Sequence, residues 1–296
     1  METYAAVRAH GLKSRLLTSR DYEALLREEK KISDFKDYSL ILDSDTLETK
    51  LEKIYRVYIS RIETVGKAGM GINDLAMALL DRLEVENIKM HLRYILGAQR
   101  PIIYYPYGRH IGPKKLSTLK TEGALWEELS KTPLQAPSSP EFSTALEAER
   151  EFLLDLLYYN FLVQVIKKLN LSRDAKIILE NSIKEEFEKK TILWIRILNP
   201  SIVLNTAIKY HIPIRIPSIP EEWKNLKTTE LMQQIQASLI QNLKDKIGIG
   251  HSIDAAYLYY FNQLALLEAN NLEKILVGKE VRIPEEIIQR YITIIY

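Results

Sequence analysis

Three six-residue stretches decide the fold: LEVENI at residues 83–88, FEKKTI at residues 187–192 and LEANNL at residues 267–272. Each reads as an apolar residue, Glu, two variable residues, a small hydrogen-bonding residue, and then Ile or Leu. The copies lie 104 and 80 residues apart, which exceeds the period of the common helical solenoids. The spacing therefore predicts one small module used three times, and it favours a shaped scaffold over an enzyme.

The small polar residue of each copy should lie on or beside the inward face of a helix, because residues four apart share a face. These residues are Asn87, Thr191 and Asn271. A buried amide or hydroxyl without a partner costs roughly 1–3 kcal/mol. We therefore expect each to bond to the backbone of a neighbouring helix or loop in its own module, with Glu84 and Glu268 sharing that network.

Apolar positions recur at helical spacing through most of the chain, and no alternating strand pattern is present. The sequence predicts an all-α fold of three tandem domains, residues 1–105, 106–205 and 206–296. Loops are expected where Pro and Gly cluster, at 104–113 and 212–220. The expected helices are 3–30 in two pieces, one from residue 45 or 46 to about 66, 73–97, 121–131, 146–166, 172–197, 221–246, 252–277 and one from Pro284. Thr18, Asn73 and Ser172 are expected to cap the helices that they precede, and Asn199-Pro200 is expected to stop helix 172–197.

Composition excludes several classes of protein. With 41 basic and 39 acidic residues the net charge is +2, so no electrostatic footprint for nucleic acid is present. The absence of cysteine excludes disulfides, thiolate metal sites and cysteine nucleophiles. No signal peptide and no apolar run of about 20 residues is visible, so we expect no bilayer span. The abundance of Ile, Leu, Lys and Glu is typical of a helix-rich protein from a warm-living source.

Other chemical motifs are better explained structurally. The glycines at 66–71 lack a following Gly-Lys-Ser/Thr and predict a helix–helix connection. The five histidines show no metal-type spacing, and His91 should lie at a helix surface or boundary. The basic pair Lys114-Lys115 near three tyrosines indicates linker packing. The carboxylates should line charged helix faces: Glu147, Glu149, Glu185, Glu186 and Glu188. We therefore expect no catalytic residue, cofactor or metal.

The three repeated stretches and their surroundings resemble the C subunit of the archaeal-type rotary ATP synthase, also called the A-type or V/A-type enzyme. This subunit is related to the d subunit of the eukaryotic vacuolar ATPase. The resemblance covers both ends of the chain and the spacing between them. It is carried by YAAVR at 4–8, KSRLLT at 13–18, Tyr22 with Leu25-Leu26, ENIK at 86–89 with Leu92-Arg93, EANNL at 268–272, VGK at 277–279 and IPEEI at 283–287.

The middle copy departs from the family pattern. Thr191 replaces the expected Asn after Glu188, and either Arg196 or Lys190 matches the basic position only loosely. The glycine-rich entries to the second and third modules are also thinned. This departure affects how the residues of the middle module align with the family pattern, and it does not affect the resemblance of the whole chain.

The resemblance implies a funnel of three similar helical domains around a pseudo-threefold axis. One end would sit on the membrane rotor ring of c/K subunits, and the other would receive the central shaft, which is made of the D and F subunits. A protein of this kind has no active site of its own. As a peripheral protein on the cytoplasmic face of the membrane, it passes torque between ATP synthesis or hydrolysis and the transport of protons or sodium.

Two other classes of protein stay open. The first is a helical repeat adaptor that binds partner helices in a groove. The second is an all-α enzyme that uses clustered carboxylates. A closed funnel with a hollow axis would separate the rotor protein from the adaptor, and a pocket with a strongly shifted carboxylate pKa would favour the enzyme.

Overall fold

The computed structural model describes residues 1–294. All regular secondary structure in this range is helical, and no strand occurs in it. The predicted all-α class is therefore confirmed.

The chain divides into two compact units. Unit 1 combines Met1–Met77, Asn170–Leu179 and the chain from Asn225 onward, whereas unit 2 comprises Ala78–Leu169 and Glu180–Lys224. The predicted boundaries after residues 105 and 205 both lie inside unit 2. The division into three tandem domains stays a prediction.

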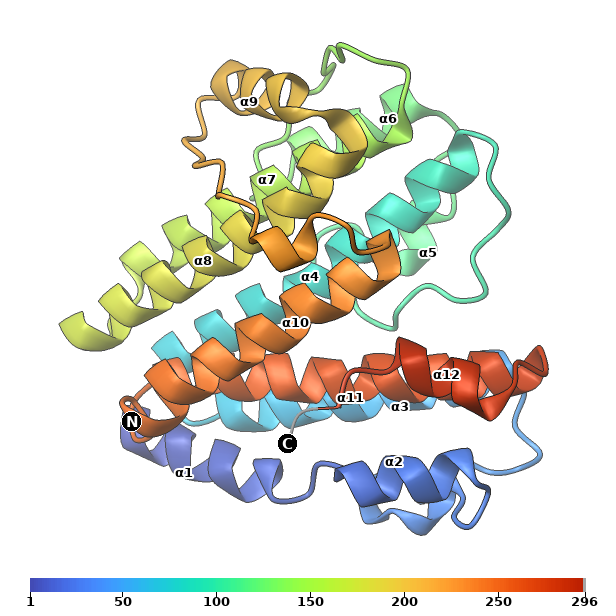
Figure 1. Cartoon of the computed structure of the whole chain (residues 1–296). Coiled ribbons are helices and arrows are strands. Elements are labelled where there is room, and N and C mark those ends of the chain that lie inside the picture. The colour runs from blue at the N-terminus through green and yellow to red at the C-terminus, as the bar shows by residue number, and fades with distance from the viewer. Residues whose placement is uncertain (295–296) are drawn as a thin grey trace. The chain divides into compact units, whose positions relative to one another are not determined.

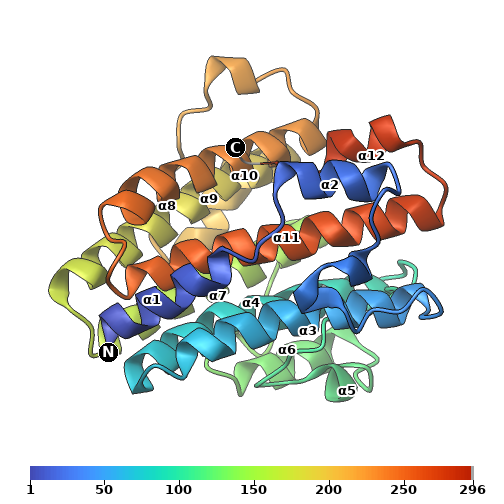
Figure 2. The ribbon, with the colours of Figure 1, turned by 90° about the horizontal axis from the view of Figure 1, so that it is seen from below.

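Unit 1 is built around the helix α11, Ala256–Glu280, which lies beside α1 and α3 (Figures 1 and 2). Its buried residues lie on all of its faces. A helix that is apolar all round is typical of the centre of a core. It packs against α1, α3, α10 and α12. The other helices of this unit are α1 Glu2–Lys13, α2 Ser19–Leu26, α3 Leu47–Gly66, α10 Thr228–Leu243, α12 Glu285–Tyr291, the 3-10 turns Ile32–Asp34 and Lys36–Tyr38, and the π-helical turn Lys244–Ile249.

Hydrogen bonds supplement the apolar contact between α3 and α11. The Tyr58 hydroxyl donates to Asn262 Oδ1 at 2.7 Å, and the Tyr55 hydroxyl donates to Asn270 Oδ1 at 2.9 Å. Both tyrosine side chains are fully buried. The bonds therefore satisfy polar atoms that would otherwise be costly to remove from water.

Unit 2 contains α7, Glu147–Lys168, which packs against α9, Pro200–Lys209. The α7 side chains of Phe152, Leu153, Leu154 and Leu156 are fully buried. The remaining elements of this unit are α5 Pro113–Leu116, α6 Glu122–Ser130 and the 3-10 turn Glu221–Trp223.

Two long helices contribute residues to both units: α4, Met70–Ile95, and α8, Arg173–Leu198. Asn199-Pro200 ends α8 as predicted, and the chain bends by 118° into α9. Within residues 1–294 no single helix has the length and hydropathy needed to cross a membrane; only the bent pair of α8 and α9 passes that test, on length and composition alone.

Most expected helices are present; the differences lie at their ends and in α5 and α9, which were not expected. Thr18 caps α2 in a reciprocal pair with Asp21, Thr46 caps α3, and residues 212–220 are free of regular structure, as predicted. The prediction that Asn73 begins α4 was wrong. Its backbone N–H already donates to the Gly69 carbonyl at 2.8 Å, so the helix begins at Met70. The expected helix 221–246 is broken into a 3-10 turn and α10.

Candidate functional site

Asn87 on α4 binds the loop that follows this helix through a reciprocal pair of hydrogen bonds. Its Oδ1 accepts from the Tyr105 backbone N–H at 2.7 Å, and its Nδ2 donates to the Tyr105 carbonyl at 2.9 Å and to the Tyr107 carbonyl at 3.1 Å. Asn87 is 1% exposed. The side-chain amide therefore satisfies both an N–H group and carbonyl groups of the loop backbone.

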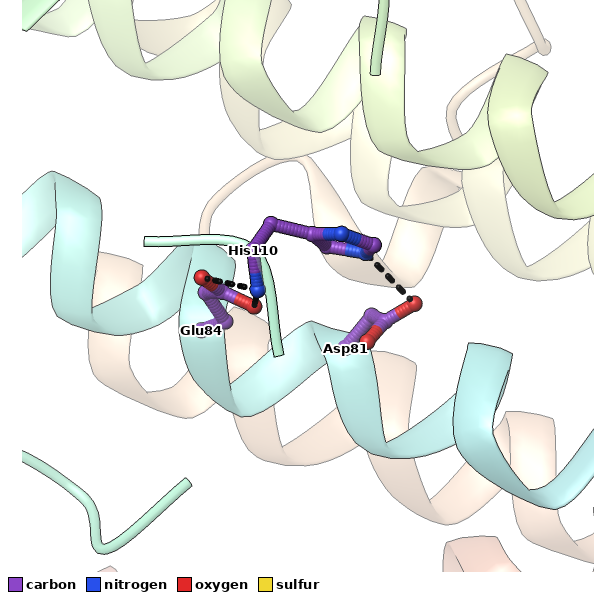
Figure 3. Close-up of side chains that lie close together, drawn as sticks. All are labelled: Asp81, Glu84 and His110. Atoms are coloured by element: carbon purple, nitrogen blue, oxygen red, sulfur yellow. Dashed lines mark hydrogen bonds and ion pairs between the residues drawn. The ribbon is translucent and has the colours of Figure 1, made fainter. Parts of the chain in front are cut away.

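Glu84, one turn earlier on α4, holds the next part of the same loop (Figure 3). Its carboxylate accepts backbone N–H bonds from Arg109 at 2.8 Å, from His110 at 3.0 Å, and from Ile111. Three successive N–H groups directed at one anion form a nest that satisfies its buried charge. Together we call Glu84, Asn87 and residues 105–111 the α4 clamp.

Asp81 extends the α4 clamp by one more turn of the helix. Its carboxylate accepts from the Arg109 guanidinium at 2.5 Å and from the Tyr107 hydroxyl at 3.2 Å, and it lies 3.3 Å from His110 Nε2. Burial, followed by the Asp81 charge, raises the pKa of Tyr107 well above its ordinary value.

Asp81, Glu84 and His110 offer three ligand atoms within 4.8 Å of one another, which is close enough to hold a metal ion. However, Arg109 already balances the charge of Asp81, and the carboxylate of Glu84 already accepts three backbone donors. A metal would have to displace these partners. The cluster therefore fits a structural role better than a metal centre.

The third copy of the motif builds the same reciprocal pair on α11. Asn271 Oδ1 accepts from the Thr293 backbone N–H at 3.0 Å, and its Nδ2 donates to the Thr293 carbonyl at 2.8 Å. Thr293 follows Asn271 by 22 residues, and Tyr105 follows Asn87 by 18. Both Asn residues thus bind a later segment of the chain that returns alongside their helix.

Glu268 on α11 is buried and receives three donors, as Glu84 does, but from other parts of the chain. Its carboxylate accepts from the Leu17 backbone N–H at 2.5 Å, the Tyr38 hydroxyl at 2.6 Å and Arg61 Nη1 at 2.6 Å. Burial, followed by the charge of Glu268, raises the pKa of Tyr38 well above its ordinary value. Glu268, Asn271 and these partners form the α11 clamp.

The middle copy forms no such clamp, and the prediction for Thr191 was wrong. Its hydroxyl donates to the Phe187 carbonyl of its own helix at 2.8 Å. A threonine side chain is shorter than asparagine and has one polar atom, so bonding to the preceding turn is its usual solution. Glu188 is half-buried, and it makes no hydrogen bond or ion pair within the described residues.

The buried acid at this part of α8 is instead Glu186, which directly precedes the middle copy. It is 2% exposed and accepts from Arg82 Nη1 at 2.6 Å, the Tyr159 hydroxyl at 2.7 Å and Lys190 Nζ at 2.5 Å. Desolvation, followed by the charge of Arg82, lowers the pKa of Lys190 to about 8.

Further ion pairs join α4 to α7. Arg93 donates to Glu151 at 2.6 and 3.1 Å, and Lys89 pairs with Asp155. The sequence singled out Arg93 as part of a signature but did not predict its partner. The acids and bases along α4 and α7 were a usable signal for such ion pairs, because charges spaced three or four residues apart share a helix face.

Two other sequence interpretations, which placed His91 at a helix surface or boundary and Glu149 and Glu186 on charged helix faces, were wrong. His91 is fully buried, and its ring nitrogens lie 2.7 Å from the Tyr104 hydroxyl and 2.8 Å from the Leu119 carbonyl. Glu149 is also buried, and it accepts from the backbone N–H groups of Ser143 and Thr144. Neither Glu149 nor Glu186 lies on a solvated charged face, since loops and neighbouring helices supply donors that periodicity alone does not reveal.

The fold and its two clamps define an all-helical protein in which buried acids and amides fix loops and chain ends to long helices. In comparisons with known proteins, no protein-family model matches the chain, and no curated protein is significantly similar to it.

Proposed function

We propose that this chain is a non-catalytic central-stalk subunit of an A-type rotary ATP synthase. It would join the D and F shaft subunits to the membrane ring of c/K subunits at the cytoplasmic face of the membrane. The observation that carries the proposal is the recurrence of one clamp, a buried Glu followed three residues later by a buried Asn, on α4 and on α11. Asn87, Glu268 and Asn271 belong to the stretches that resemble the rotor family.

The clamps suit a part that passes torque. Each ties other segments of the chain to a long helix through a buried Glu and a buried Asn whose polar atoms are hydrogen-bonded, and such satisfied networks rigidify the structure around them. A rotor needs this stiffness because any internal yielding would absorb the twist before it reached the ring. The chain itself needs no reaction to fulfil this role.

The finer architecture belongs to the same proposal. Three related helical domains, residues 1–105, 106–205 and 206–296, would surround a pseudo-threefold axis to form a funnel. Two of the three copies keep the reciprocal Asn pair, through Asn87 and Asn271. The middle copy, with Thr191, would be the diverged member.

A helical adaptor is the second candidate, and one observation favours it. Unit 1 has a groove of about 510 Å³ whose apolar lining includes Leu12 of α1, Leu40 and Ile41 of the loop before α3, and Val57 of α3. The groove is also lined by charged side chains: Arg15, Asp37, Lys53, Arg56 and Arg61. An amphipathic partner helix binds in a groove through its apolar face.

A pull-down from native membranes separates the two candidates. The tagged chain should recover ring subunits, shaft subunits of the D and F type, and the ATP-hydrolysing subunits, as identified by mass spectrometry. A matched bait with Asn87→Leu and Asn271→Leu tests whether recovery depends on the clamps, and we expect it to recover less. Recovery of soluble partners without any component of the ring would reject the rotor proposal and favour the adaptor.

A further inference from the structure

Unit 1 contains a second cavity, of about 680 Å³, which is separate from the clamps. It lies where the C-terminal ends of α2 and α11 meet the segment that leads into α3. The volume is within the range of sites that hold a small organic ligand. Its walls include the buried side chains of Leu25, Ile41 and Ile275, which provide an apolar floor.

The rim of this cavity is rich in cations. Five basic side chains line it, against three carboxylates: Lys30, Lys31, Lys50, Lys279 and Arg282 against Glu28, Asp43 and Glu280. The whole chain has a net charge of only +2. The lining of this cavity therefore carries an excess of two positive charges.

Two of these cations form no ion pair within residues 1–294. Lys50 Nζ donates to the Asp43 backbone carbonyl at 3.2 Å, and the Arg282 side chain makes no hydrogen bond or ion pair there. Lys31 and Lys279 pair with Asp43 and Glu28, respectively. Hydrogen bonds from other lysines and, after them, the charge of Lys50 lower the pKa of Asp43 and of Asp45. Arg282 is therefore the cation of this rim that has no compensating carboxylate among the described residues.

Backbone strain is found at the same place. Glu28 and Arg282 have φ values of 59° and 57°, in the left-handed region that favours glycine. They follow the C-caps of α2 and α11, where glycine is the ordinary choice. A charged residue at each of these positions is unfavourable for the backbone, and such strain is often retained at ligand sites.

From this combination we propose that the cavity binds a phosphate-bearing organic anion. Lys50 and Arg282 would contact the phosphate groups, and the apolar floor would take the body of the ligand. The same chemistry is offered by a soluble nucleotide and by the headgroup of an anionic lipid. The inference stands independently of the proposed rotor role.

Calorimetry of the full chain with ATP at low ionic strength tests the soluble source, and flotation with phosphatidylglycerol–phosphatidylcholine vesicles tests the lipid source. The test variant is Lys50→Ala with Arg282→Gly. We expect it to weaken binding at least tenfold, while the melting temperature stays unchanged or rises because glycine relieves the strain at residue 282. The controls are Lys114→Ala, which removes an exposed cation elsewhere, and His211→Gly, which relieves a similar φ of 55°.

ATP binding that is lost in the double variant supports the proposal with a nucleotide as ligand. Vesicle binding alone, lost in the same variant, supports it with a lipid headgroup as ligand. Binding should also fall as salt is added, because the contacts are between charges. The proposal is overturned if neither probe binds at millimolar concentration, or if the double variant binds as well as Lys114→Ala does.

Discussion

At the scale of single residues, the structure depends on amides that pair with a backbone in both directions. Replacing Asn271 by Leu removes a donor and an acceptor and leaves the Thr293 peptide groups unpaired. We expect the free energy of unfolding of unit 1 to fall by about 1–3 kcal/mol. Native-state hydrogen exchange of the α11 amides measures the free energy of unfolding of unit 1 separately from that of unit 2.

The matched control is Thr191→Val, because the Thr191 hydroxyl bonds only within its own helix. Its effect should stay below about 1 kcal/mol. Asn87→Leu should act on unit 2 as Asn271→Leu acts on unit 1. Equal, negligible effects of all three substitutions would contradict a structural role for the clamps.

Lys190 makes a pH-dependent contribution. Its pKa is lowered from 10.5 to about 8 in the folded chain, so the unfolded state binds more protons between these two pH values. Stability must therefore rise with pH across that interval, and the gain is lost as pH falls through 8. Relative to Lys190→Met, the wild type should gain up to about 3 kcal/mol in its free energy of unfolding.

Urea unfolding of both proteins at pH 7.5, 8.5 and 9.5 measures this difference. Using the difference between the two proteins removes the contribution of titrating groups that lie far from residue 190. A difference that is flat across this range would show that Lys190 keeps its ordinary pKa.

Added Zn²⁺ should leave the melting temperature unchanged, because Arg109 and the loop N–H groups already occupy Asp81 and Glu84. Differential scanning fluorimetry with and without the metal tests this. The informative comparison is Arg109→Ala, which frees Asp81 and should permit weak metal binding. A clear stabilisation of the wild type by Zn²⁺ would refute the structural interpretation of this cluster.

At the scale of elements, the contact between α11 and α12 depends on a glycine. A side chain at Gly278 would meet Ile288 at 2.8 Å, closer than real carbon contacts allow. Gly278→Val should therefore displace α12 and expose Ile288, which is 3% exposed. Hydrogen exchange should accelerate in residues 285–291. The control is Gly123→Val on α6, where nothing lies within 4 Å, and it should leave those amides unaffected.

Elements were largely predictable from the sequence, whereas their partners were not. Periodicity and capping residues such as Thr18 and Ser172 are local signals, so they locate helices directly. The donors that Glu268 receives lie more than 200 residues away along the chain. Nothing in the stretch 267–272 itself indicates these donors. In the same way, Glu186 is buried and Glu188 is only half-buried because other helices cover one face of α8, and the local sequence does not show which face this is.

At the scale of the whole molecule, unit 1 is assembled from segments far apart in the sequence. A chain that ends at Lys224 lacks α10, α11 and α12, and so it lacks the core of that unit. We expect residues 1–66 to lose hydrogen-exchange protection and to become sensitive to protease, whereas α7 and α9 retain their structure. Persistent protection of α3 in the truncated chain would show that unit 1 does not require α11.

The reciprocal Asn pair has a consequence for how this sequence can diverge. Asn87 and Asn271 recognise peptide groups, which every residue except proline supplies in full. Thr293→Ala should therefore be tolerated, whereas Thr293→Pro should lower the melting temperature. Selection can hold the position of a returning segment through one residue on the opposite helix and leave the sequence of that segment free to drift. The ancestry of a repeat would then survive in the helix that holds the segment, long after it has been erased from the segment itself.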